Sequence, residues 1–495
     1  MTRPIGISLG TFASAVCVLE GGEPVVVVNA EGSVSTPSAV CFAPDGRVLV
    51  GEPAVEQAAE QPRRTAFSAA RHLGNPRWRF PRSGDVDGRT YTAREVAARI
   101  LRKLKRDTEA RLGGTITDVI LSVPGIAGDA HRQALIEAAR IAGLNVLRLV
   151  NAPTAAGLVA ARKSAAARTV VAVNLDGGSL DVSVQELTTD GVEVRATTGD
   201  TTLGGEDWAE RILGHLAAEF RRDHGINLTQ DPATEVPLFQ AARSAMADLS
   251  VSETTTIALP GIVSGPAGPL DLKRTLTRAA FGRLTDDLAV RCRQLVHQAL
   301  KNAAVSAADV NDVLLVGDAV RVPFLGDLVS EVTGKPTRVD PHPETIAAAG
   351  AALLAGLLSE GNDGTVLDVT PYSVGIETRG DIMTRLFERD TTIPARRVES
   401  FTTGDDDEPE ISIHVLQGEA GVASHNTTVC RVRLTDIKPA PRGVPQIEVT
   451  FALDANGVVQ LTAKDLGTGK PQPFEVITGS ALPPAELDRL ICEAH

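Results

Sequence analysis

The chain has 495 residues, of which 43% are hydrophobic and 22% charged, a composition typical of a globular protein with roughly two to four domains. Its formal net charge of −13 argues against nucleic acid as a partner, because a nucleic acid repels a chain of like charge. The five cysteines are scattered and contain no C-x-x-C spacing, so we expect buried thiols in a reducing compartment, with no disulfide framework and no metal site.

The N-terminal segment is apolar up to Leu19, but it has one basic residue, Arg3, and several glycine and serine residues interrupt it. This pattern favours a cytoplasmic protein over a secreted one with a signal peptide. The longest apolar run, 346–358, is shorter than the roughly 20 residues that cross a bilayer. We therefore expect no association with a membrane.

Helix and strand patterns alternate over the first part of the chain. We expect a helix over 54–74 and an amphipathic helix over 94–112. A buried strand at 119–123 is followed by a helix over 129–142 and a further strand at 146–150. This alternation predicts an α/β lobe.

Two similar glycine turns lie far apart in the chain, each between two strand-like segments. The first contains Gly10 and Thr11, and the second contains Gly177, Gly178 and Ser179. Glycine has no side chain, so the backbone N–H groups of such turns can approach an anion closely. Two such hairpins predict two similar lobes that face one ligand.

The second lobe is expected to begin at Arg168. Residues 237–295 should be mainly helical, with a strand-like interruption at 254–259, and a strand should follow at 312–316. An Ala- and Gly-rich helix over 343–358 is expected to pack closely, because small side chains allow close approach.

The composition changes after residue 359. Residues 360–365 contain glycine, asparagine and aspartate, which predicts a linker. From 366 to 476 apolar and polar residues alternate, which predicts an antiparallel β-sandwich, and a helix should begin at Leu482. The expected divisions are an α/β domain over 1–359, a linker over 360–369, a sandwich over 370–480 and the start of a helix over 481–495.

The C-terminal part carries the most specific similarity to a known family. The segments 367–371, 375–378, 391–394, 414–419 and 439–451 resemble, in the same order, the substrate-binding domain of the seventy-kilodalton heat-shock (DnaK-type) chaperones. The two glycine turns resemble the phosphate loops of the actin/hexokinase ATPase superfamily. The resemblance covers nearly the whole chain and implies a two-lobed actin/hexokinase-like ATPase domain, a linker and an all-β sandwich that binds peptide.

Most positions that carry catalysis in this family are substituted. By this resemblance, two aspartates become Ser8 and Asn174, the catalytic lysine becomes Ala70 and a glutamate becomes Ala152, whereas Asp181 is retained. Phosphoryl transfer to water needs Mg²⁺ held by anionic oxygens, a cation on the phosphates and a group that orients the water. The substitutions therefore predict a degenerate site without hydrolysis and without its own metal ligands.

The resemblance implies ATP or ADP with Mg²⁺ as cofactors, whereas the neighbouring residues argue against binding. Phe12 and Asp176 replace a threonine and a glycine, and Arg71 is expected to point away from the site, because successive side chains diverge. The positions carried over as nucleotide contacts are Gly10, Thr11, Gly177, Gly178, Ser179, Gly204, Gly205, Ser250, Gly317 and Arg321.

In the sandwich, the resemblance implies a peptide pocket of four apolar residues beneath an arch of two. The pocket residues are Ile376, Phe401, Ile411 and Ile413, and the arch residues are Arg379 and Gly404. Burial of one leucine-like side chain there would contribute roughly 1.5–3 kcal/mol. Periodicity alone favours an ordinary sandwich core for the same four residues. Four acidic residues follow Gly404 and would favour basic segments around an apolar anchor.

These features predict a cytoplasmic DnaK-like chaperone relative that binds extended apolar segments of unfolded proteins and lacks most of the helical lid. The family also implies J-domain or nucleotide-exchange co-chaperones as partners. Two alternatives stay open at this point. One is an active ATP-dependent folding chaperone with a rebuilt nucleotide site, and the other is a non-enzymatic interaction scaffold.

Overall fold

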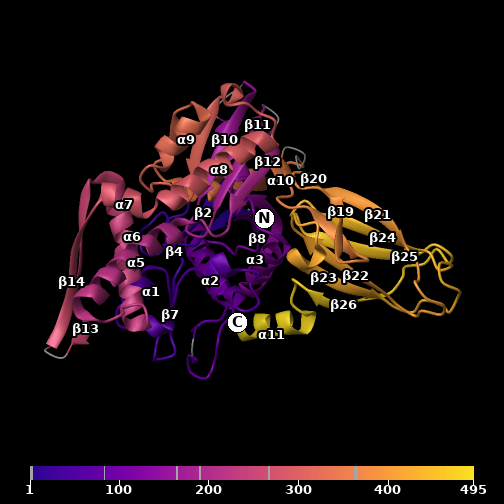
Figure 1. Ribbon diagram of the computed structural model, residues 1–495, viewed down its shortest axis with the longest axis horizontal. Coiled ribbons are helices and arrows are strands. Elements are labelled where there is room, and N and C mark those ends of the chain that lie inside the picture. The colour runs from indigo at the N-terminus through magenta and orange to yellow at the C-terminus, as the bar shows by residue number, and fades with distance from the viewer. Residues whose placement is uncertain are drawn as a thin grey trace.

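The computed structural model describes residues 4–82, 84–162, 166–188, 191–265, 268–361 and 366–494. Two α/β lobes lie on the left of Figure 1, and a β-domain, in orange and yellow, projects to the right. Residues 362–365 of the expected linker lie outside the described residues. Among the residues that are described, no helix is both long enough and apolar enough to span a membrane.

Lobe I is built on a sheet with strand order β3-β2-β1-β8-β9, and β4 pairs with β2. The first glycine turn joins β1 to β2 as predicted, and β1 also pairs in parallel with β8. Two helices, α2 and α3, contribute apolar side chains to the core of this lobe. The bounds are β1 (Ile5–Leu9), β2 (Ala13–Glu20), β3 (Glu23–Val26), β4 (Thr36–Pro37), β8 (Asp118–Val123), β9 (Asn145–Asn151), α2 (Ala93–Leu112) and α3 (Asp129–Ile141).

The ends of α2 follow from its sequence. Thr92 and Glu95 form a capping box at the start, and Gly113 ends the helix in the left-handed conformation. In contrast, the long helix expected over 54–74 is wrong. Pro62 has no N–H to continue a helix, and Ser68 has a φ of 60°. The segment instead forms α1 (Glu52–Gln57), η1 (Pro62–Arg64), β7 (Thr65–Ala66) and η2 (Ala69–His72), and β7 joins β5 (Val40–Phe42) and β6 (Val48–Val50) in a small sheet.

Lobe II contains a sheet with strand order β16-β15-β10-β11-β12-β17-β20. The second glycine turn joins β10 to β11, again as predicted. The strands are β10 (Arg168–Leu175), β11 (Leu180–Leu187), β12 (Val192–Asp200), β15 (Asp312–Val316), β16 (Thr337–Val339), β17 (Val366–Val369) and β20 (Thr392–Ile393). The helices are α5 (Gly205–His224), α6 (Pro232–Val251), α7 (Arg278–Leu284), α8 (Asp286–Asn302) and α9 (Leu325–Thr333).

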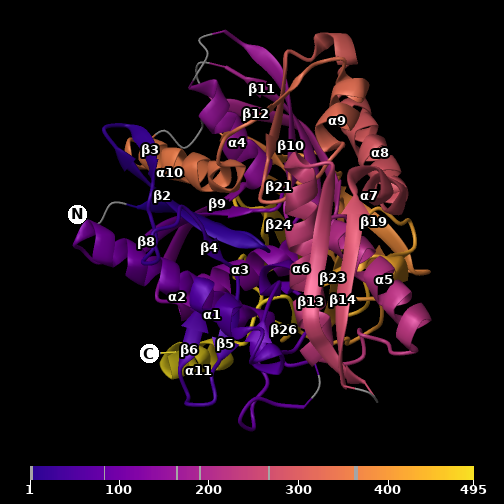
Figure 2. The same cartoon turned by 90° about the vertical axis from the view of Figure 1, so that its left-hand side faces the viewer.

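The interruption expected at 254–259 is larger than predicted. It is a hairpin of β13 (Thr254–Gly265) and β14 (Gly268–Thr277), which projects at the left of Figure 1 and faces the viewer in Figure 2. Alternate residues such as Ile257 and Leu272 are buried in the core of lobe II, so the hairpin packs one face on the lobe.

Two helices, α4 (Ala152–Ala161) and α10 (Ile346–Ser359), lie between the two sheets and share an apolar cluster with both. A β-carbon at Gly350 would stand 2.0 Å from the carbonyl oxygen of Ala155. A β-carbon at Gly6 would stand 2.2 Å from the backbone nitrogen of Ala352. The close packing expected of the Ala- and Gly-rich helix is therefore confirmed.

The β-domain consists of two antiparallel sheets, β19-β18-β22-β23-β26 and β21-β24-β25, around one apolar core. Alternate residues of β24 are buried, as the sequence pattern predicts. The strands are β18 (Val374–Thr378), β19 (Ile382–Phe387), β21 (Ala395–Phe401), β22 (Ile411–Gln417), β23 (Thr427–Leu434), β24 (Ile447–Leu453), β25 (Val459–Asp465) and β26 (Phe474–Gly479).

The β-domain contacts lobe I through α3. The Asp129 carboxylate accepts a hydrogen bond from the backbone of Val459 at 2.9 Å, and the Asp129 N–H donates to Gln417 at 3.0 Å. The Arg132 guanidinium donates to the carbonyl oxygen of Asn456 at 2.9 Å. These bonds join the second half of the chain to the first.

After the β-domain, α11 (Pro484–Ala494) returns to lobe I and lies close to α3 (Figure 1). Leu490 is 5% exposed and belongs to the core of lobe I. Arg89 forms an ion pair with Glu493 at 2.7 Å. Cys492 is exposed, so the expectation that all five thiols are buried is wrong for this one, because α11 buries a single face.

We expect Leu490→Ala to loosen α11, because removing a buried leucine side chain costs about 2–5 kcal/mol. A protease should then cleave the C-terminal segment faster than in the wild-type chain, as measured by mass spectrometry of the products over time. Asp488→Ala, at an exposed position of the same helix, is the control and should leave the rate unchanged. Equal cleavage rates for wild type and Leu490→Ala would contradict the packing of α11.

Candidate functional site

The two glycine turns face each other where the lobes meet. A β-carbon at Gly178 would stand 2.7 Å from the Thr11 hydroxyl, and one at Gly204 would stand 2.3 Å from the carbonyl oxygen of Gly177. Gly317, with a φ of 105°, lies against Asn174. The structure thus brings together Gly10, Thr11, Gly177, Gly178, Ser179, Gly204, Gly205 and Gly317, all predicted from the sequence.

The ring of Phe12 occupies the space between the turns. A β-carbon at either Gly177 or Gly205 would stand 2.8 Å from this ring, so the two glycines make room for it. Phe12 is 8% exposed and belongs to the core of lobe II, although its backbone lies in lobe I. The guanidinium carbon of Arg243, on α6, lies 3.8 Å from the ring centroid in a cation–π contact. One aromatic side chain therefore joins the two lobes.

The amides of the first turn already have an anionic partner. The backbone N–H groups of Phe12 and Ala13 donate to one oxygen of Asp318 at 3.0 and 3.2 Å. A carboxylate that accepts from successive backbone N–H groups is placed as a bound anion would be. Burial, and then the charge of Asp176, raises the pKa of Asp318.

The backbone N–H groups at the start of α5 also have hydrogen-bond acceptors within the chain. The N–H groups of Gly205 and Glu206 donate to carbonyl oxygens of the second turn at 2.9 and 2.8 Å. The Gly204 N–H donates to the Asp207 carboxylate at 2.6 Å. These are the amides that a helix terminus would otherwise offer to a phosphate.

The expectation that Arg71 points away from the site is wrong. Its guanidinium crosses from η2 to lobe II and binds Glu206 at 3.0 Å and Asp207 at 2.8 Å. The turn of η2 after the left-handed Ser68 directs Arg71 to the cleft, while Ala70 is buried in the core of lobe I. Ser68 also donates to Glu206. Burial raises the pKa of Glu206 to about 7, although the charge of Arg71 opposes the shift.

Asp181 lies at the centre of a buried polar cluster. The Asn174 amide donates to both Asp176 and Asp181 at 3.0 Å, and the Gly125 N–H donates to Asp181 at 3.1 Å. Asp181 is 0% exposed, and burial raises its pKa to about 7. One oxygen of Asp181 and the Ser179 hydroxyl are buried without a hydrogen-bond partner. In the part of the chain that the structure describes, no group of three or more His, Cys, Asp or Glu side chains is arranged to hold a metal ion.

The other predicted residues lie in regular elements or have other hydrogen-bond partners. Ser8 lies in β1 opposite Ala15, and Ala152 is buried at the start of α4. The Ser250 hydroxyl donates to its own helix at 2.6 Å. The exposed Arg321 donates to the carbonyl oxygen of Pro341 at 2.5 Å, so its guanidinium is engaged on a neighbouring loop.

The residues expected to form a peptide pocket divide into two pairs. Ile376 and Ile413 are buried in the core of the sandwich. Phe401 and Ile411 are only partly buried, and the Phe401 ring lies 6.2 Å from that of Phe451. The two arch residues, Arg379 and Gly404, are both exposed.

Three residues that define this site were not predicted as contacts, namely Arg71, Arg243 and Asp318. The substitution of a small residue by Phe12 was visible in the sequence, and a bulky ring in a phosphate loop indicates that the loop is filled from within. The partners of that ring come from segments far along the chain. Local patterns therefore give no indication of them.

A comparison with protein-family models gives one match for nearly the whole chain. The model described as "Hsp70 protein" matches residues 4–495. The matched range includes both lobes, the β-domain and α11, so the similarity is not confined to one domain.

We expect Asp181→Asn to reduce the pH dependence of stability. Because the pKa of Asp181 is about 7 when folded and about 3.9 when unfolded, the folded chain holds a proton that the unfolded chain has released. Stability therefore falls as the pH rises through this interval. The asparagine keeps the acceptor for Gly125 and carries no charge, so about 2 kcal/mol of the loss in unfolding free energy between about pH 5.5 and about pH 8 should disappear.

Urea titration of the transition that unfolds the lobes, at both pH values, measures this difference. Asp488→Asn, at an exposed carboxylate, is the control and should keep the wild-type dependence. An unchanged dependence in Asp181→Asn would mean that Asp181 is already ionised at the lower pH.

Proposed function

Because the chain belongs to the Hsp70 family of chaperones, we propose that it binds extended apolar segments of unfolded proteins through its β-domain and does so without nucleotide. Members of this family generally bind ATP or ADP with Mg²⁺, unfolded peptides and co-chaperones. One observation supports the proposal that this chain, unlike the family in general, works without nucleotide. The cleft is filled, because the Phe12 ring and the Asp318 carboxylate take the place of a ligand.

The residues of the cleft do not suit a nucleoside triphosphate with Mg²⁺. Its binding would require the Phe12 ring to leave a buried position, at a cost of roughly 1.5–3 kcal/mol. It would also displace Asp318 from the amides of the first turn. Asp176, Asp181 and Asp318 place three buried carboxyl groups with raised pKa values close to where the phosphates would lie, and such groups offer a phosphate no positive charge, whereas Ala70 supplies no cation. We therefore assign no hydrolytic step to this site.

The chain's own side chains hold the lobes together in the proposed function. Arg71 joins η2 to α5 through two carboxylates, and all three side chains are largely buried. Loss of one partner from a buried ion pair costs about 3–5 kcal/mol, because the other charge is left buried and unpaired, so we expect the packing of the lobes to require Arg71. The two lobes then act as a scaffold on which the β-domain is docked.

The β-domain offers the chemistry for peptide binding. Phe401 and Ile411 are partly exposed at the edge of an apolar core, which suits one apolar side chain of a client. The acidic segment 405–408 follows Gly404 and complements basic residues that flank such an anchor. We therefore propose clients in which basic residues surround an apolar one.

The peptide proposal predicts a loss of binding in Phe401→Ala. A fluorescein-labelled peptide with a leucine between arginines, titrated with the full chain, should bind roughly tenfold more weakly to this variant, equivalent to about 1.4 kcal/mol. Val398→Ala, on the same strand with 44% exposure, is the matched control and should bind as the wild type does. Equal affinities of Phe401→Ala and wild type would contradict the proposed pocket.

The nucleotide proposal predicts no saturable heat when ATP with Mg²⁺ is titrated calorimetrically into the chain. The affinity for the labelled peptide should likewise be the same with and without ATP. Saturable ATP binding, or a peptide affinity that changes with ATP, would show that the cleft opens to a ligand.

A further inference from the structure

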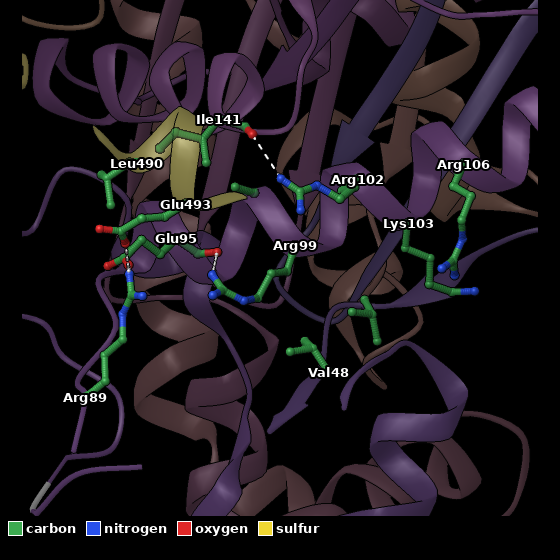
Figure 3. A pocket seen from close by; sticks show the side chains of 12 residues that line it. Val48, Arg89, Glu95, Arg99, Arg102, Lys103, Arg106, Ile141, Leu490 and Glu493 are labelled. Carbon is green, nitrogen blue, oxygen red and sulfur yellow. Dashed lines mark hydrogen bonds and ion pairs between the residues drawn. The ribbon is translucent and has the colours of Figure 1, made fainter. Parts of the chain in front are cut away.

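Two groups of polar side chains outside the interlobe cleft differ in what they do. In the cavity between α2 and α11, Arg89 binds both Glu95 and Glu493 at 2.7 Å, and Arg102 donates to the carbonyl oxygen of Ile141 (Figure 3). The contact with Glu493 helps to hold α11 on lobe I. The second group lies on the outer face of the β-domain and ends in an exposed hydroxyl group.

This second group is a chain of hydrogen bonds across three neighbouring strands. Glu377 lies on β18, His414 on β22 and Thr428 on β23. A carboxylate oxygen of Glu377 lies 2.6 Å from Nδ1 of His414, and the Thr428 hydroxyl oxygen lies 2.9 Å from Nε2. Because β22 pairs with β18 on one side and with β23 on the other, the sheet backbone fixes the spacing of the three side chains.

The two neighbours of His414 determine which ring nitrogen carries the proton. An ionised carboxylate can only accept a hydrogen bond, so Nδ1 donates to Glu377. A neutral imidazole then has its lone pair at Nε2, where it accepts from the Thr428 hydroxyl. A hydroxyl on a base, with the base oriented by a carboxylate, is the arrangement that activates a nucleophile.

The three side chains lie on the face of the sheet that is opposite to the apolar core. Their chain neighbours Ile376, Ile413 and Val429 are buried in that core, and successive side chains of a strand point to opposite faces. Thr428 is exposed, whereas the side chain of His414 is only 10% exposed. A reagent in solution can therefore reach the hydroxyl while the base keeps its orientation.

We propose that Thr428 is a site of covalent acylation, at which its hydroxyl takes the acyl group of an activated ester of a small carboxylic acid. The Thr428 oxygen attacks the carbonyl carbon of the ester, and Nε2 of His414 accepts the hydroxyl proton. The bond between the carbonyl carbon and the leaving oxygen then breaks, and His414 returns the proton to that oxygen. The products are an acyl ester of Thr428 and the free alcohol.

Glu377 is a positioning residue in this reaction. Its carboxylate keeps the Nε2 lone pair of His414 directed at the hydroxyl and stabilises the imidazolium that forms during proton transfer. The site uses neither the interlobe cleft nor the apolar pocket of the sandwich, so the inference is independent of the proposed function.

Incubation of the full chain with p-nitrophenyl acetate, followed by peptide mapping with mass spectrometry, tests the proposal. Thr428 should gain one acetyl group faster than Thr427, an exposed threonine on the same strand. Thr428→Val should remove this modification, whereas the matched control Thr427→Val should leave it unchanged. His414→Asn should slow acetylation of Thr428 by roughly a factor of ten or more, because a general base contributes about 10²–10⁴-fold to such reactions.

Two variants of Glu377 separate positioning from a merely structural role. Glu377→Gln should slow acetylation of Thr428, and Glu377→Asp, which keeps a carboxylate, should retain more of the rate. The thermal unfolding midpoint of each variant verifies folding, and the Glu377 variants decide the outcome if His414→Asn is unstable. The proposal is overturned if Thr428 is acetylated no faster than Thr427, or if folded His414→Asn reacts as fast as the wild type.

Discussion

The contact of the Phe12 ring with two glycines of lobe II is the constraint on which the arrangement of the lobes depends. Phe12 belongs to lobe I, but its ring is buried against Gly177 and Gly205, where a β-carbon would leave it too little space. Arg243 covers the ring, and Asp318 binds the amide of the same residue. Any opening of the lobes would have to break an apolar contact, a cation–π contact and two backbone hydrogen bonds together.

The backbone N–H groups around this ring are arranged as in an anion site but have hydrogen-bond acceptors within the chain. Backbone N–H groups converge as they would on a phosphate, yet a carboxylate from lobe II accepts from them. Burial of carboxyl groups is costly when they are charged, and the raised pKa values of Asp181 and Glu206 are consistent with this cost. Arg71 and Arg243 supply positive charge close by. The backbone N–H groups at this site therefore have partners within the chain, whereas one oxygen of Asp181 and the Ser179 hydroxyl do not.

The sequence predicts this architecture well where local patterns are long or paired with glycine turns. The helices over 94–112 and 129–142 and both glycine hairpins are confirmed, because apolar periodicity and glycine chemistry act over a few residues. The prediction of one helix over 54–74 is wrong because one proline and one left-handed serine outweigh the helical composition of the segment. The prediction that Arg71 points away from the site is wrong because the direction of its side chain depends on that same turn. Asp318 lies 306 residues from Phe12, so only the packed lobes bring the two together.

The same elements that lie between the two lobes also contact the β-domain. Asn151 directly precedes α4, one of the helices between the lobes, and its side-chain oxygen accepts a hydrogen bond from Arg132 at 2.7 Å. Arg132 also binds the β-domain turn at Asn456, while Thr154 of α4 donates to Asp368 of β17 at 3.0 Å. The strand β17 pairs with β12 and so extends the sheet of lobe II toward the β-domain. If side chains rather than a nucleotide hold the lobes closed, the position of the β-domain is then set by the amino-acid sequence itself.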